Sequence, residues 1–187
     1  MPPKVKVTKQ DVLNAATELV RSQGAQALNA RALAQVLGCS TQPIFSNYEN
    51  MEQLRTDVIA RGWEEYGDYI RKEIESKRYP DYKAYGIAYI RFAQEEKELF
   101  KFLFMRERSP QEAANSDTDI TEVIELIRKT TGLSEEMAKR LHLEVWTFVH
   151  GIATMTVTSY LNLDWEFISE MVTDVYQGLM LRFGVKE

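Results

Sequence analysis

The stretch of sequence that decides the fold is residues 29–54, NARALAQVLGCSTQPIFSNYENMEQL. Apolar residues recur near its start at the spacing of one helix face, and these residues are Ala30, Leu33, Ala34 and Leu37. Gly38 supplies the left-handed conformation that ends a helix, and Ser40 is suited to cap a following one. The stretch therefore predicts two short helices joined by a tight turn, with a third helix starting directly afterwards.

The second of these short helices has one apolar and one polar side. Ile44 and Tyr48 form the apolar side, and at about 100° per residue Gln42 and Ser46 point most directly away from it. Uncharged hydrogen-bonding groups on an outward face are suited to meet base edges in the major groove of DNA. The pattern is therefore interpreted as a helix-turn-helix.

A helix-turn-helix gives its exposed residues specific roles. We expect Gln42 and Ser46 to contact bases, the alternative being that they are merely exposed helix residues. Arg31 either reaches a phosphate or pairs with an acidic residue, and the basic residues before position 8 form either an arm along the DNA or a tail without a partner. The complete set predicted to contact DNA is Lys4, Lys6, Arg31, Ser40, Thr41, Gln42, Pro43, Ser46 and Asn47.

Charge is distributed unevenly along the 187 residues. Five basic and three acidic residues precede position 51, which gives +2 and leaves −7 of the formal net charge of −5 to the remainder. A mildly basic N-terminal part on an acidic body supports DNA contact through the N-terminal part alone.

Three features of the sequence indicate the compartment. No apolar run reaches the roughly 18 residues of a membrane span, and the N-terminus lacks the apolar core of a secretory signal. The single cysteine excludes an internal disulfide and suits a reducing environment. We therefore expect a cytoplasmic protein without a membrane partner.

Alternating strand patterns are almost absent, so the chain is predicted to be all-α with about nine helices. Helix starts are indicated by a capping box at Thr8 and Asp11 and by caps at Asn29, Ser134 and Asp164. We expect residues 1–50 to form a three-helix DNA-binding domain and residues 51–187 a larger helical ligand-binding and dimerisation domain. The expected helices cover residues 8–23, begin again after Asn29 and after Ser40, and then cover about 50–77, 82–96, 98–108, 118–131, 134–161 and 164–184.

The predicted body is rich in large aromatic residues, most of which recur at helical spacing and belong in a core. We expect a subset to line a cavity for an apolar or aromatic small molecule, because such cavities combine apolar walls with a few oriented polar groups. A buried histidine can equally be a core residue with a satisfied hydrogen bond, and this alternative stays open for position 150. The predicted ligand-binding residues are Tyr66, Tyr89, Phe92, Phe104, Trp146 and His150.

The last predicted helix, residues 164–184, carries an apolar stripe that is wide for a terminal helix. Packing on its own chain would use only one side of that stripe. The other side, together with Gly151, Thr154 and Thr158, suits a twofold interface between two copies of the chain.

Patterns typical of enzymes are missing from the sequence. Lys139 and Thr147 stand three residues before the two histidines, so the Glu-x-x-His pairs of di-iron proteins are absent. The chain also has no cysteine pair for zinc and no glycine-rich phosphate loop. We therefore expect no catalytic activity, no metal site and no cofactor.

These spaced positions resemble the TetR family of bacterial transcription regulators. The N-terminal resemblance rests on Gly24, Leu28-Asn29, Leu33-Ala34, residues 37–40, Ile44-Phe45, Tyr48 and Leu54. The segment from Trp146 to Gly151 resembles a Trp-x-x-x-His-Gly segment of one large branch of the family. The resemblance implies a homodimer whose last two helices form a four-helix interface, and a ligand cavity in the body.

The sequence departs from the family pattern at the predicted DNA-contacting surface. Gln42-Pro43 replaces the common Gly followed by Thr or Ala, and Met51 replaces a frequent lysine. Phe45 stands where the family often has an aromatic hydroxyl that reaches a phosphate, and a phenylalanine cannot donate that hydrogen bond.

These observations together predict a homodimeric regulator of transcription that binds double-stranded DNA. We expect a repressor that a small-molecule effector, apolar or aromatic, releases from a palindromic operator. The alternatives are a regulator that activates transcription and one whose N-terminal domain binds a protein partner.

Overall fold

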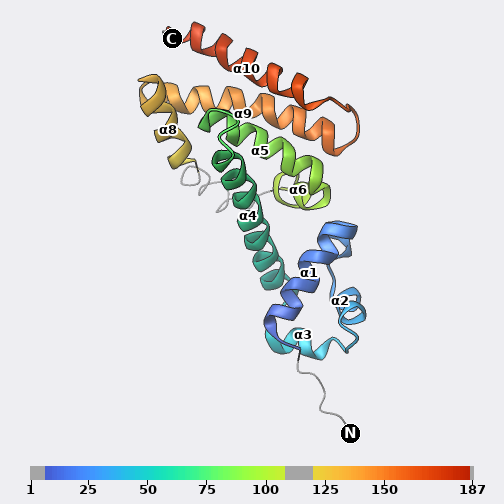
Figure 1. Cartoon of the computed structure of the whole chain (residues 1–187). Helices are drawn as coiled ribbons and strands as arrows, with labels where there is room; N and C mark the ends of the chain where they lie inside the picture. Colours follow the sequence, from blue (N-terminus) through green and yellow to red (C-terminus); the bar gives the residue numbers. More distant parts are fainter. Residues whose placement is uncertain (1–6, 108–119, 186–187) are drawn as a thin grey trace. The chain divides into compact units, whose positions relative to one another are not determined.

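The computed structural model describes residues 7–107 and 120–185 (Figure 1). All regular secondary structure over these residues is helical, which confirms the predicted all-α class. The nine α-helices and one 3₁₀ helix of this described part are α1 (Lys9–Gln23), η1 (Ala25–Ala27), α2 (Ala30–Val36), α3 (Gln42–Asn47), α4 (Met51–Glu75), α5 (Asp81–Glu95), α6 (Lys97–Phe104), α8 (Thr121–Thr131), α9 (Glu135–Val157) and α10 (Trp165–Arg182).

The chain forms two compact units. The first unit comprises Met1–Gly67 and Glu96–Arg106, and the second comprises Asp68–Glu95 and Glu107–Glu187. α4 contributes residues to both units, and α6 belongs to the first. The predicted boundary after residue 50 divides the chain by expected function, which these two compact units do not test, and it stays a prediction.

Local capping interactions set the helix starts of the first unit, as the sequence predicted. The Thr8 hydroxyl accepts a hydrogen bond from the Asp11 amide at 3.1 Å, and the Asp11 carboxylate accepts one from the Thr8 amide at 2.9 Å. α1 ends at Gly24, whose φ of 82° favours glycine. The Asn29 side chain accepts a hydrogen bond from the Ala32 amide at 3.0 Å and thereby caps α2.

The start of α3 differs from the expectation. Ser40 does not cap this helix; Thr41 occupies the N-cap position, and no side chain caps the helix there. Thr41 already has helical backbone angles, and its carbonyl accepts a hydrogen bond from the Ile44 amide at 3.2 Å. Pro43 has no amide hydrogen. The amides that a capping side chain usually reaches are therefore absent or already bonded.

α1 packs against α2, α3, η1 and α6 in the first unit. The residues buried there come from every α-helix of the unit, and the contacts between them form its core. The largest buried apolar side chains of this core belong to Leu33, Ile44, Tyr48, Leu54, Leu99, Phe100 and Leu103.

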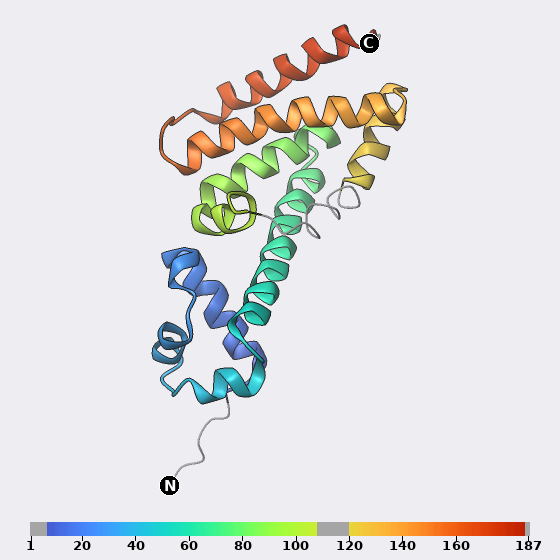
Figure 2. The same ribbon diagram turned by 180° about the vertical axis from the view of Figure 1, so that it is seen from behind.

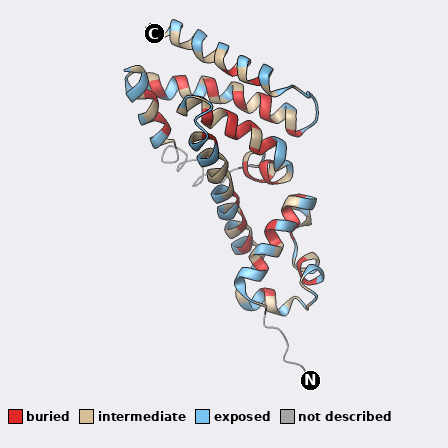
Figure 3. Ribbon diagram, in the orientation of Figure 1, coloured by how far each residue is buried: buried red, intermediate tan, exposed pale blue. Residues whose placement is uncertain are grey.

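α9 is the central helix of the second unit. It packs along α5 and also contacts α8 and α10, and both views show α9 running beside α5 and α10 (Figures 1 and 2). Ile87 and Ile90 on α5 and Leu141 and Val149 on α9 are buried, and Figure 3 shows buried positions along both helices. The residues that pair across α5 and α9 are 60 and 61 positions apart, so this contact joins helices that are distant in sequence.

The ends of α9 show where local signals suffice and where they do not. Ser134 accepts a hydrogen bond from the Met137 amide at 3.3 Å and caps the start, as predicted. The helix ends at Val157, four residues before the predicted end at Leu161. Ser159 has a φ of 57°, and this left-handed conformation cannot continue an α-helix.

Among the described helices, none combines the length and the hydropathy that crossing a membrane would require.

Two phenylalanines of the first unit should differ sharply in their contribution to stability. Phe100 is 0% exposed, whereas Phe45 is 48% exposed. Phe100→Ala should lower the free energy of unfolding by about 3–5 kcal/mol because it leaves a cavity in the core. Phe45→Ala should change it by less than about 0.5 kcal/mol. Denaturant titration followed by circular dichroism measures both, and equal losses would contradict the assignment of the core.

Candidate nucleic-acid interface

The outward side of α3 has the orientation that the sequence predicted. Gln42, Phe45 and Ser46 are exposed, while Ile44 and the adjoining Tyr48 are buried at 0% and 2% exposure. The Ser46 hydroxyl donates a hydrogen bond to the Gln42 carbonyl at 2.9 Å, and its oxygen can still accept a hydrogen bond. The roles of Gln42 and Ser46 as base contacts stay predictions.

Tyr48 directly follows α3 and lies on its buried side. Burial, and after it the negative charge of Asp57, raises the pKa of Tyr48 to about 12. The Lys9 ammonium lies 4.9 Å from the centre of the Tyr48 ring and 2.9 Å from the Asp57 carboxylate. The phenol therefore stays neutral in the physiological range, and residues from α1 and α4 enclose it.

Asn47 links α3 to the beginning of α1. Its side-chain amide donates hydrogen bonds to the Val7 carbonyl at 3.2 Å and to the Pro43 carbonyl at 2.8 Å. An amide has only two N–H groups, so a phosphate contact through Asn47 would require it to release one of these carbonyls.

The remaining predicted DNA-contacting residues differ in their exposure to solvent. Arg31 and Ser40 are exposed, whereas Thr41 and Pro43 are half-buried. The two lysines of the predicted arm, Lys4 and Lys6, lie outside the described residues.

One arginine joins three helices of the first unit. The Arg21 guanidinium on α1 donates to Glu96 at 2.8 Å and to Glu18 at 2.9 Å, and also to Glu65 on α4. Glu96 directly precedes α6. Partial burial lowers the pKa of Arg21, but its hydrogen bonds to Glu96, Glu18 and Glu65 outweigh that effect and shift the pKa upward. Sequence analysis missed this cluster, because Glu65 and Glu96 are 44 and 75 positions from Arg21.

Aromatic side chains from α4 and α6 form a second cluster in the first unit. The Phe104 ring lies 5.0 Å from Trp63 and 5.4 Å from Tyr66, centre to centre, with both pairs edge to face. Phe100 lies 4.9 Å from Phe104 on the same helix. Tyr66 and Phe104, two of the predicted ligand-binding residues, are thus in contact.

The other four predicted ligand-binding residues belong to the second unit. The Tyr89 hydroxyl on α5 lies 2.8 Å from Nδ1 of His150 on α9, and the Trp146 ring stacks on the His150 ring at 4.9 Å. Phe92 is buried beside Tyr69, with 5.3 Å between ring centres. The structure therefore brings Tyr89, Trp146 and His150 together.

A second tyrosine–histidine pair lies between the same two helices. The Tyr82 hydroxyl is 3.2 Å from Nδ1 of His142. Burial lowers the pKa of His142, which favours the neutral imidazole, and burial raises the pKa of Tyr82. The two pairs connect α5 and α9 at successive positions along their contact.

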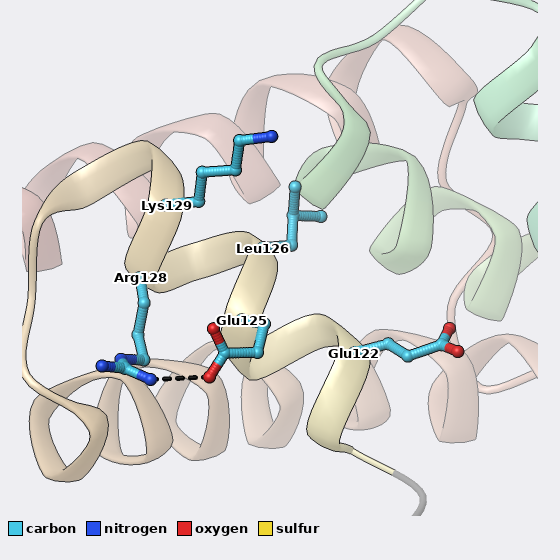
Figure 4. A pocket seen from close by; sticks show the side chains of 5 residues that line it. All are labelled: Glu122, Glu125, Leu126, Arg128 and Lys129. Carbon is cyan, nitrogen blue, oxygen red and sulfur yellow. Dashed lines mark hydrogen bonds and ion pairs between the residues drawn. The ribbon is translucent and has the colours of Figure 1, made fainter.

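A surface hollow lies along α8 and differs in character from the predicted ligand site. Its lining residues are Glu122, Glu125, Leu126, Arg128 and Lys129 (Figure 4). Glu125 and Arg128 form an ion pair at 2.6 Å across the helix surface. The hollow is thus mostly charged and contains none of the predicted ligand-binding residues. The part of the chain that the structure describes holds no group of three or more His, Cys, Asp or Glu side chains positioned to bind a metal ion.

Comparisons with known proteins bear on both the fold and the family. The family described as "Tetracyclin repressor-like, C-terminal domain" matches residues 82–175. A solved structure from Rhodococcus sp. RHA1, described as that of a protein with unknown function, is similar to this chain with a TM-score of 0.72. It shares 20% sequence identity, and the similarity covers 100% of this chain and 98% of that one. This likeness supports the fold alone. The comparison with curated proteins gives no match.

Removal of the Arg21 charge should destabilise the protein. Arg21→Met keeps most of the aliphatic stem but leaves three carboxylates without their shared cation. We expect a loss of about 1–3 kcal/mol in the free energy of unfolding at pH 7, between the values typical of exposed and buried ion pairs.

The matched control is Arg61→Met. Arg61 is more exposed than Arg21 and pairs only within α4, with Glu65 at 3.5 Å and Glu64 at 3.9 Å. We expect this variant to lose less than about 0.5 kcal/mol. Chemical denaturation at pH 7 tests both variants, and an equal loss would show that the Arg21 cluster does not hold the helices together.

Proposed function

Because this chain belongs to the tetracyclin repressor-like family, we propose that it is a homodimeric transcriptional regulator that binds double-stranded DNA and is released by a small molecule. The observation that carries this proposal is the exposed polar side of α3 opposite its buried apolar side. A short helix fixed in this way is the element that a helix-turn-helix protein inserts into the major groove.

Gln42 and Ser46 are the proposed base contacts. The amide of Gln42 pairs in a bidentate way with adenine, and the hydroxyl of Ser46, whose hydrogen is donated to the Gln42 carbonyl, accepts a hydrogen bond from a base. Arg31, Thr41 and Asn47 are the proposed phosphate contacts, with Ser40 and Pro43 completing the surface and Lys4 and Lys6 forming an arm. Since α3 carries no basic residue, we expect a modest dependence of affinity on salt concentration.

A dimer would supply two such helices. α10 exposes Phe167 at 48% and Leu181 at 78%, and α9 exposes Leu143 at 60%, measured on the isolated chain. Large apolar side chains exposed on two adjacent helices are suited to a self-complementary interface. Two copies of α3 about 34–36 Å apart would then bind successive major grooves of a palindromic site.

The contact between α5 and α9 supports a ligand site in the second unit. Tyr89, Trp146 and His150 combine ring surfaces with polar groups that have defined orientations. This chemistry suits an apolar or aromatic molecule that bears one hydrogen-bonding group. Because α4 contributes residues to both units, a ligand that favours one arrangement of the second unit would act on the first through this helix.

The DNA-binding proposal is tested with the double variant Gln42→Ala, Ser46→Ala. The probe is a DNA duplex selected by the full-length protein from a random library. Each base contact contributes about 1–3 kcal/mol, so the double variant should bind this probe at least about tenfold more weakly. Fluorescence anisotropy measures the dissociation constants. Gln94→Ala, an exposed glutamine on α5, serves as the control and should bind normally. Undiminished binding by the double variant would contradict the assignment of α3.

The dimer proposal is tested with Leu181→Arg. A cation in the proposed interface must be desolvated without a partner, so this variant should sediment as a monomer at concentrations where the natural chain is a dimer. Met105→Arg is the control, because Met105 is exposed to 43% and lies in the first unit. Analytical ultracentrifugation distinguishes the outcomes. A monomeric natural chain, or a dimer that tolerates arginine at position 181, would exclude this interface.

A further inference from the structure

Phe45 is an exposed aromatic ring on the same helix as the proposed base contacts. Its side chain is 48% exposed, whereas the neighbouring Ile44 is fully buried. The core beneath α3 is filled by Ile44 and Tyr48, so Phe45 is not required there. A ring that remains half in water at this position is available to a partner.

The position of Phe45 on α3 places it beside the two polar side chains. With about 3.6 residues per turn, Phe45 lies about 60° to one side of Gln42, and Ser46 lies about 40° to the other side. The three side chains therefore share an outward sector of about 100°, which a groove that receives Gln42 and Ser46 would also enclose.

We propose that Phe45 packs on the 5-methyl group of a thymine and thereby selects thymine at one position of each half-site. This inference rests on the proposed DNA-binding function and names one further specificity-determining residue. The thymine methyl is the apolar group that a base pair presents in the major groove, and a phenyl ring is an apolar side chain that contacts it. Phe45 cannot donate a hydrogen bond to a phosphate, so dispersion and desolvation are the interactions left to it.

The test replaces thymine by deoxyuridine, which differs only by the absence of the methyl group. A duplex selected by the full-length natural chain from a random library is synthesised with deoxyuridine at each thymine position in turn. At one position per half-site, the natural chain should bind the deoxyuridine duplex about fourfold more weakly, the factor that corresponds to burial of one methyl group. A second pair of duplexes has cytosine or 5-methylcytosine in place of thymine at that position. The natural chain should bind the 5-methylcytosine duplex more tightly than the cytosine duplex.

Three variants assign the effect to Phe45. Phe45→Ala should bind the thymine and deoxyuridine duplexes equally, and its far-ultraviolet circular dichroism and melting temperature should match those of the natural chain. Phe45→Tyr keeps the ring and should keep the fourfold preference. Val36→Ala removes another exposed apolar side chain of the same unit, on α2, and should also keep the preference.

The outcomes separate this inference from the function on which it rests. Failure of the natural chain to bind any duplex would overturn both. Binding that is unaffected by every deoxyuridine substitution would overturn only the role of Phe45, as would a preference that survives in Phe45→Ala or a selected site without a shared thymine.

Discussion

Burial of Ile44 and Tyr48 is the constraint on which the proposed interface depends. A helix of six residues does not hold its own shape in water, since most of its amides have no partner within the helix. Contacts of these two side chains with the core therefore decide both that α3 forms and which side it exposes. The phenol of Tyr48, beside the Lys9–Asp57 ion pair, adds a second requirement, because its burial disfavours the charged form and raises its pKa.

The first unit also shows how helices distant in sequence are held by shared polar groups. Arg21 offers five donors in a rigid plane, and its three nitrogens each donate to a different carboxylate. Because Glu65 is on α4 and Glu96 precedes α6, a displacement of either helix would alter the position of the end of α1. The cluster lies in the same unit as α3, so the rigidity of the proposed DNA-binding part depends on it.

Sequence alone predicted those features that a few neighbouring residues determine. The caps at Thr8, Asn29 and Ser134 were confirmed, because each acts within one helical turn. The predicted cap at Ser40 was wrong, because Pro43 has no amide hydrogen and the helical carbonyl of Thr41 already accepts from the Ile44 amide. Pairings across helices could not be predicted: Arg21 finds partners 44 and 75 positions away, and Tyr89 finds His150 only through the register between α5 and α9. The spacing of Trp146 and His150 showed that they share one side of a helix, but it did not show which helix packs against that side.

The hydrogen bond from Asn47 to the Val7 carbonyl has a practical consequence for handling the protein. It fixes Val7 beside the last residue of α3, so a tag or label attached at Val7 would lie close to the proposed recognition helix. An affinity tag added there would compete with DNA for the same space, and a polyhistidine tag would add cationic charge of its own at low pH. Fluorophores and surface-immobilisation chemistry therefore belong away from Val7, and also away from Leu181, which lies in the proposed dimer interface.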